Sequence, residues 1–223
     1  YMIVVKKMKK YKLVIFDMDG TIADTSPGIF NSIRYTEEKM GLPEITYEQM
    51  YSHVGPPMEE SYNRNFGLTG DELKKAVMYH KEYAIKQGFK ELKIYDGMLP
   101  LIDELRKNGI KTAVATLKAH ATIIKIFESF GITDKFDEVI GVSQDEPKTK
   151  AQLLEHCVEK LGVSKTDAVL IGDSKYDAIG AEQAGIDFIA VTYGFGFKSA
   201  ADADEYANVG AFDSVEKLKS FLV

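Results

Sequence analysis

Five short apolar runs, separated by segments of helical periodicity, limit the folds that are open to this chain. Apolar runs rich in β-branched residues are typical of strands buried on both faces of a sheet. Strands that alternate with helices form a parallel sheet with helices on both faces. We therefore expect an α/β protein with a Rossmann-like three-layer α/β/α core around a parallel sheet. The expected strands are Tyr11–Asp17, Lys111–Ala115, Phe136–Ile140, Ala168–Ile171 and Phe188–Val191. The expected helices of this core are Met98–Asn108, Ala119–Phe130, Lys150–Leu161, Tyr176–Ala184 and Val215–Phe221.

Residues 24–95 interrupt the alternation, because helical patterns follow one another there without a strand-like run. These patterns lie at Pro27–Met40, Thr46–Tyr51, Met58–Phe66 and Asp71–Gln87. We expect residues 24–95 to form an all-helical domain inserted after the first strand. Residues 11–23 and 96–223 would then form the α/β core, with hinges at Asp24–Thr25 and Tyr95–Asp96.

The composition limits the binding partners and the cellular compartment that we expect for this protein. Twenty-eight Lys and Arg against 34 Asp and Glu give a formal net charge of −6 over 223 residues. No overall basic field would attract nucleic acid or an anionic membrane. The one cysteine, Cys157, excludes an internal disulfide, and no window approaches the roughly 18 apolar residues of a membrane-spanning helix. We therefore expect a cytoplasmic monomer or small homo-oligomer, with no nucleic-acid or membrane partner.

Acidic residues follow two of the expected strands, at the point where each strand ends. Asp17 and Asp19 close the first strand and precede Gly20, which permits a tight turn, and Asp173 and Asp177 follow a later strand. Because the carboxyl ends of parallel strands meet at one edge of a sheet, we expect these carboxylates to lie close together. One carboxylate of the first pair can act as a nucleophile and the other as a general acid/base.

Four carboxylates at one edge repel one another and require a cation. Hard oxygen donors, without a second cysteine or paired histidines, favour Mg²⁺ over zinc or copper. The sequence therefore predicts Mg²⁺ as the cofactor.

Two further segments place polar side chains near the same edge. Thr116 ends the run Lys111–Ala115, where its hydroxyl suits a phosphate oxygen. The same position also suits the N-cap of a helix over Leu117–Phe130, and the two roles are compatible. Lys148 and Lys150 precede or open a later helix, where a lysine would neutralise a nucleophilic carboxylate and a phosphoryl group in transfer.

Along the chain these elements are the pair Asp17 and Asp19, then Thr116, then Lys148 or Lys150, and last Asp173 and Asp177. Taken in this order, the four elements resemble the haloacid dehalogenase superfamily of phosphotransferases, from about residue 11 onward. The resemblance implies that Asp17 is the nucleophile and forms an aspartyl-phosphate. It implies that Asp19 protonates the leaving group and later activates water, while its backbone carbonyl binds Mg²⁺. Asp17 and Asp173 would supply side-chain metal ligands, Asp177 would orient the metal shell, and Thr116 would bind phosphoryl oxygens.

The resemblance leaves the lysine open. Lys148 has the spacing from Leu161-Gly162 at which many members carry a Lys-Pro pair, but Thr149 stands in place of the proline. Lys150 opens a Lys-Ala helix start that is found in some members. Both lysines are therefore candidates for the phosphate-facing cation.

The resemblance also indicates a particular branch of the superfamily. Asp19 argues for phosphate-ester chemistry, and residues 24–95 resemble the small helical cap of the family. The segments His53-Val54-Gly55-Pro56-Pro57 and Tyr193-Gly194-Phe195-Gly196 are most similar to the phosphoglycolate phosphatase-like branch, which includes nucleotidases and pyrophosphatases. The resemblance implies a Mg²⁺-dependent phosphatase for a small soluble phosphomonoester such as phosphoglycolate or a nucleotide.

Two alternatives remain open at this point. A sugar phosphomutase of the same superfamily would return the phosphate to another hydroxyl, although Thr21 differs from the aliphatic residue common in that branch. A non-catalytic module that binds a phosphorylated ligand is the second alternative, and the intact Asp17, Asp19 and Asp173 argue against it.

Overall fold

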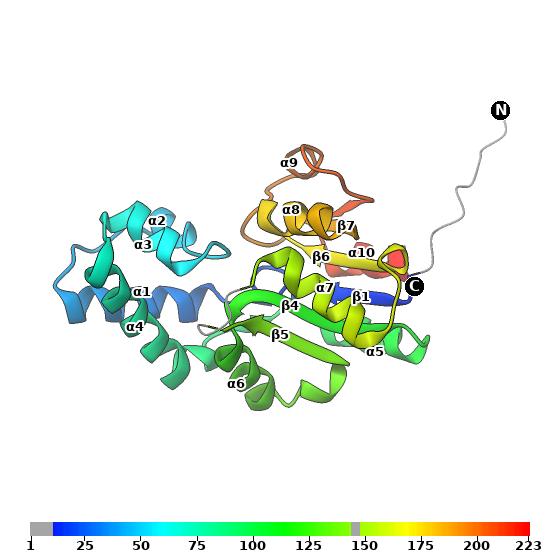
Figure 1. Cartoon of the computed structure of the whole chain (residues 1–223), viewed down its shortest axis with the longest axis horizontal. Helices are drawn as coiled ribbons and strands as arrows, with labels where there is room; N and C mark the ends of the chain where they lie inside the picture. Colours follow the sequence, from blue (N-terminus) through cyan, green and yellow to red (C-terminus); the bar gives the residue numbers. More distant parts are fainter. Residues whose placement is uncertain (1–10, 144–147) are drawn as a thin grey trace.

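A parallel sheet forms the centre of the larger part of the molecule (Figure 1). The computed structural model describes residues 11–143 and 148–223. Within these residues the sheet has six strands in the order β5-β4-β1-β6-β7-β8, and every neighbouring pair is parallel. The strands are β1 (Leu13–Phe16), β4 (Lys111–Ala119), β5 (Glu138–Val142), β6 (Ala168–Gly172), β7 (Asp187–Val191) and β8 (Ala211–Phe212).

Helices cover both faces of this sheet and complete three layers, which confirms the predicted fold class. On one face lie α5 (Met98–Lys107), α6 (His120–Phe130) and α10 (Val215–Leu222). On the other face lie α7 (Lys150–Leu161), α8 (Lys175–Ala184) and α9 (Ala200–Ala203).

Strand β1 lies at the centre because its side chains are apolar on both faces. Val14 and Phe16 pack into one apolar cluster, and Leu13 and Ile15 pack into the other. None of the four side chains has solvent-exposed surface. β1 pairs with β4 on one side and β6 on the other, so the carboxyl ends of these three strands are adjacent.

Strand β4 is longer than the sequence predicts. It continues to Ala119, which pairs with Val142 of β5 after an irregularity in the register. Helix α6 begins at His120 with Ala119 as its N-cap, so the predicted helix-capping role of Thr116 was wrong. The polar residues after Ala115 do not continue the apolar run, and pairing with β5 extends the strand instead.

Four helices form a second body at the left of Figure 1, which is the inserted cap. They are α1 (Ser26–Met40), α2 (Tyr47–Tyr51), α3 (Met58–Phe66) and α4 (Gly70–Lys86). Small apolar clusters around Tyr62 and Ile33 hold them together. The boundaries at residues 24 and 95 stay a prediction.

A two-stranded antiparallel pair links the cap to the core. In this pair β2 (Ala23–Asp24) lies beside β3 (Lys93–Ile94), so the two chain crossings between the parts are neighbours. The expectation that residues 24–95 contain no strand was therefore wrong at both ends of the insertion. Strands of two residues are too short for an alternating pattern to reveal them.

The chain also has short 3₁₀ turns at Gly88–Lys90, Thr133–Lys135 and Lys165–Asp167. No helix in the described part of the chain combines the length and apolar character needed to cross a bilayer.

Candidate active site

The turn after β1 carries the first two carboxylates. The backbone N–H of Asp17 still donates to the carbonyl of Ile171 in β6, at 2.9 Å, so Asp17 is fixed at the end of the strand. Gly20 has φ of +76°, and its N–H donates to the carbonyl of Ala23, at 2.9 Å. A Cβ on Gly20 would lie 2.2 Å from Asp173 Oδ2, so only glycine lets the turn approach the neighbouring carboxylate.

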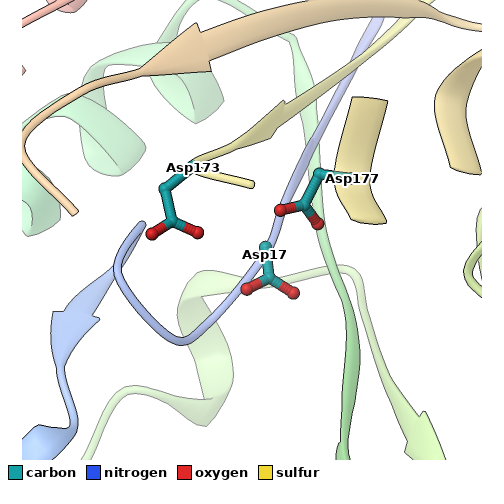
Figure 2. Close-up of side chains that lie close together, drawn as sticks. All are labelled: Asp17, Asp173 and Asp177. Atoms are coloured by element: carbon teal, nitrogen blue, oxygen red, sulfur yellow. The ribbon is translucent and has the colours of Figure 1, made fainter. Parts of the chain in front are cut away.

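Three carboxylates face one another at the carboxyl edge of the sheet (Figure 2). Asp17 follows β1, Asp173 follows β6, and Asp177 lies in the first turn of α8. Each offers an oxygen within 4.8 Å of those of the other two. Their exposed fractions are 7%, 3% and 2%, so the cluster is almost withdrawn from solvent.

Backbone and hydroxyl donors orient two of these carboxylates. Asp173 Oδ2 accepts the N–H groups of Phe195, at 2.6 Å, and Gly196, at 3.1 Å. Asp177 Oδ2 accepts the N–H and the hydroxyl of Ser174, at 3.1 and 2.6 Å, in a capping box at the start of α8. The local fold therefore holds both side chains in place before any ligand binds.

Lys150 supplies a buried positive charge to the cluster. Its Nζ lies 2.6 Å from Asp17 Oδ1, 2.6 Å from Asp177 Oδ1 and 2.8 Å from the carbonyl oxygen of Ala115. Lys150 is the first residue of α7, which begins at the N-cap Thr149.

Lys148 lies elsewhere. It lines a separate groove of about 860 Å³ between the cap and the core, together with residues such as Met58 and His120. Of the two candidate lysines, the structure brings Lys150 and not Lys148 to Asp17.

Burial and mutual repulsion shift the acid–base behaviour of the cluster. Burial raises the pKa of Asp17 to about 8, with further increases from Asp177 and Asp19, although Lys150 acts in the opposite direction. Burial and Asp177 raise the pKa of Asp173 to about 7. For Lys150, burial lowers the pKa, but Asp17 and Asp177 outweigh it and raise the pKa above its ordinary value.

This donor set suits a hard divalent cation. Asp17, Asp173 and Asp177 provide carboxylate oxygens within reach of one ion. Burial, together with the neighbouring carboxylates, raises the pKa values of Asp17 and Asp173, so a bound cation would stabilise their charged forms. Oxygen ligands of this kind are those that Mg²⁺ prefers. The side chain of Asp19 is not part of this three-residue cluster.

Asp19 lies apart from the cluster, with its own partners. Its Oδ1 accepts a hydrogen bond from Thr25 and lies 2.9 Å from Lys118 Nζ. Lys118 was not among the site residues predicted from the sequence. Lys118 follows Thr116 by two residues, and residues with this spacing lie on the same face of an extended strand. This spacing was the signal in the sequence that could have placed Lys118 in the site.

A small cavity joins these residues. Asp17, Asp19, Thr116, Lys118 and Lys150 line it from the core. Gly55 of the cap and Tyr176 of α8 also line it. Its volume of about 10 Å³ is close to that of one water molecule. The cavity is therefore too small for a phosphomonoester in this arrangement of cap and core.

Thr116 lies deep in this cavity, with an exposed fraction of 1%. Its hydroxyl oxygen accepts the N–H of Lys118, at 3.2 Å, which leaves the hydroxyl proton available to an anionic oxygen. The structure thus brings Asp17, Asp19, Thr116, Lys150, Asp173 and Asp177 to one edge of the sheet.

Comparison with known proteins agrees with this architecture. The tyrosine-protein kinase PtkA of Mycobacterium tuberculosis is 33% identical over 212 residues, which span 95% of this chain and 72% of that protein. A phosphoglycolate phosphatase of Chromobacterium violaceum is 29% identical over 90% of this chain and 94% of its own length. The crystal structure of a predicted phosphatase from Clostridium acetobutylicum superposes with a TM-score of 0.87 at 32% identity, over 95% of this chain and 97% of that one.

A model of the haloacid dehalogenase-like hydrolase family matches residues 14–191, which extend from β1 through the cap to β7. The match includes every member of the acid cluster and Lys150. The chain therefore belongs to the haloacid dehalogenase-like hydrolases.

Proposed function

We propose that this protein is a Mg²⁺-dependent phosphatase that hydrolyses a small phosphomonoester through an aspartyl-phosphate on Asp17. The observation that carries the proposal is that Asp17 contacts Lys150 and also lies within reach of one ion together with Asp173 and Asp177. Asp19, two residues along the chain, lies in the same cavity with different partners. Two carboxylates in one cavity, each held by a different lysine, suit separate nucleophilic and acid–base roles.

The names of the relatives support a phosphate ester as the substrate class. Relatives include phosphoglycolate phosphatases and a 5'-nucleotidase of Pseudomonas aeruginosa, which is 28% identical over 84% of this chain and 85% of its own length. Both names denote the release of phosphate from a small organic ester. We extend this chemistry to the present chain as part of the proposal.

In the first half of the reaction the Asp17 carboxylate attacks phosphorus and forms the Asp17–phosphate bond. The bond between phosphorus and the leaving oxygen breaks, and Asp19 gives its proton to that oxygen. Lys150 offsets the charge on Asp17, and the Thr116 hydroxyl donates to a phosphoryl oxygen. When bound by Asp17, Asp173, Asp177 and the backbone carbonyl of Asp19, Mg²⁺ would neutralise negative charge on the phosphoryl oxygens.

In the second half a water molecule attacks phosphorus while Asp19 takes its proton. The bond between phosphorus and Asp17 breaks, so that free phosphate forms and Asp17 returns as a carboxylate. Two displacements replace one difficult hydrolysis, and this division is the gain from a covalent intermediate. The closed cap keeps bulk water away during transfer.

Phosphate release from a panel of esters tests the proposal. The panel contains phosphoglycolate, nucleoside monophosphates, sugar phosphates and pyrophosphate, each with Mg²⁺ and with a chelator. We expect turnover that requires Mg²⁺ and is lost in both Asp17→Asn and Asp19→Asn. Background rates for every substrate with Mg²⁺ would remove the hydrolase proposal, and accumulation of a bisphosphate would indicate a mutase instead.

The similarity to PtkA supplies a second candidate, transfer of phosphate to a protein tyrosine. The same aspartyl-phosphate could pass its phosphoryl group to a phenol oxygen rather than to water. The same samples, incubated with γ-labelled ATP and a tyrosine peptide, separate the two functions. Label on the peptide that depends on Asp17 would favour transfer, and label in free phosphate would favour hydrolysis.

A further inference from the structure

The cap touches the core next to the residues that hold the acid cluster. The Tyr176 hydroxyl, on α8, donates to both carboxylate oxygens of Glu60 on α3, at 3.0 and 3.3 Å. Tyr176 directly precedes Asp177 in the chain and lines the catalytic cavity. A contact between the cap and the core therefore lies in the first turn of α8, directly beside Asp177.

A second contact lies close to the same carboxylates. The ring of Tyr51, at the end of α2, packs on the ring of Phe195, with the centroids 6.1 Å apart. The backbone N–H of Phe195 donates to Asp173 Oδ2, at 2.6 Å. The cap thus rests on a segment that orients Asp173 directly.

Arg64 joins the two contacts inside the cap. Its Nη1 lies 3.4 Å from Glu60 Oε1, and its Nη2 donates to the carbonyl of Ser52, at 2.5 Å. Ser52 follows Tyr51 in the chain. Arg64 therefore connects Glu60, the partner of Tyr176, to the residue that follows Tyr51, the partner of Phe195.

The strength of these contacts suits a cap that closes over the site and opens again. Tyr176 donates to a charged acceptor, and such hydrogen bonds are stronger than neutral ones. The Glu60 side chain is 50% exposed, so solvent screens the interaction and limits its free energy. The small cavity requires the cap to open for a substrate, so a weak but specific contact is suitable.

We propose that the hydrogen bond between Tyr176 and Glu60, here called the clasp, couples closure of the cap to the orientation in which Asp173 and Asp177 bind Mg²⁺. This inference rests on the proposed function, because it assumes that the acid cluster binds Mg²⁺. Tyr176 is a positioning residue, since it acts through the first turn of α8, which carries Asp177. Coupling between two sites is reciprocal, so loss of the clasp weakens Mg²⁺ binding as much as Mg²⁺ stabilises closure.

Calorimetric titration of the full chain with Mg²⁺ tests the coupling without any substrate. We expect Tyr176→Phe and Glu60→Ala each to raise the Kd for Mg²⁺ by about fivefold. The double variant should lose no more than either single variant, because both remove the same hydrogen bond. Tyr47→Phe and Glu38→Ala are matched controls on exposed positions of the cap and should keep the original Kd.

Hydrogen exchange provides a second readout. In the unsubstituted chain, Mg²⁺ should slow exchange of the amides in α3, although α3 carries none of the acid cluster. The slowing should disappear in Tyr176→Phe. Glu60→Ala truncates a half-exposed side chain and provides the same test if Tyr176→Phe folds poorly.

The outcomes separate the clasp from the function. Tight Mg²⁺ binding that neither variant changes would overturn the clasp while leaving the phosphatase intact. Losses that add in the double variant would also overturn it, because they would show two independent effects. Failure of the unsubstituted chain to bind Mg²⁺ would overturn the metal step of the proposed function, and the clasp with it.

Discussion

Lys150 Nζ lies 2.6 Å from Asp17 Oδ1, although 133 residues separate the two in the chain. The ammonium group also contacts Asp177 and is buried with both carboxylates. The protein thus places one fixed positive charge among three buried carboxylates. The first two predictions follow from this imbalance.

Replacement of Lys150 by Met keeps the length of the side chain and removes its charge. We expect phosphate release to fall by about 10²- to 10³-fold, because the transferring phosphoryl group loses a fixed cation. The metal-free protein should lose roughly 3 kcal/mol of unfolding free energy, because a buried ion pair is broken. Steady-state kinetics and urea unfolding measure the two effects. Lys148→Met is the matched control, and equal losses in both variants would contradict the assignment to Lys150.

Replacement of Asp17 by Asn removes the nucleophile and also one buried negative charge. The rate should fall by at least about 10³-fold. In chelator, folding raises the pKa of Asp17 from 3.8 to about 8, so the unfolded chain releases a proton that the folded chain keeps. Stability of the unsubstituted protein is therefore lost as the pH rises through this window.

The amide of the Asp17→Asn variant does not titrate, so the unfolding free energies of the two proteins should diverge between about pH 4 and about pH 8. Urea unfolding in chelator across this range measures the difference. Added Mg²⁺ should reduce it, since the cation offsets the charge on Asp17. A difference that stays constant with pH would argue against a raised pKa.

His80 in the cap predicts the opposite pH dependence. Burial, with contributions from His53, Lys118 and Lys81, lowers the pKa of His80 from 6.5 to about 3. As the pH falls below about 6.5, the unfolded chain takes up a proton that the folded chain refuses, so stability is lost in acid. His80→Gln should lose less stability between about pH 6.5 and about pH 4 than the unsubstituted protein.

Far-UV circular dichroism during urea unfolding measures this change. His156→Gln, at a half-exposed position on α7, serves as the control and should follow the unsubstituted protein. An unchanged acid profile in His80→Gln would show that the buried imidazole does not govern the cap.

Gly20→Ala tests the turn between the two catalytic segments. The new Cβ would lie 2.2 Å from Asp173 Oδ2 at a φ of +76°, so the turn and the carboxylate must separate. We expect the rate to fall by about 10²-fold, because small displacements of reacting groups are costly. Gly41→Ala is the matched control, since Gly41 has φ of +65° and no atom within 4 Å of its would-be Cβ. It should lower stability by about 1 kcal/mol and leave the rate unchanged.

The sequence predicts the sheet and the acid cluster because both depend on local patterns. β1 is apolar at every position, and Asp17 follows it directly, so strand and carboxylate are read together. The same reasoning places Asp173 after β6. Parallel pairing then brings the two ends together without further information from the sequence.

The remaining parts of the site depend on contacts between distant segments. The side that Lys148 and Lys150 face is decided by where α7 begins, and the two differ by only two residues. Lys118 reaches Asp19 because pairing with β5 extends β4 beyond its apolar run. Tyr176 and Glu60 are 116 residues apart, and nothing in either local sequence indicates the other.

The pairing of β2 with β3 has a consequence for how the cap is inserted into the core. Ala23 and Ile94 are register partners, so the entry and exit of the whole cap lie opposite each other in one antiparallel pair, at a separation of about 5 Å. A link of one or two residues could bridge that gap, and the strand order of the core would not change. The chain therefore leaves the core and returns to it at one point, so that the insertion leaves the order of the core strands undisturbed.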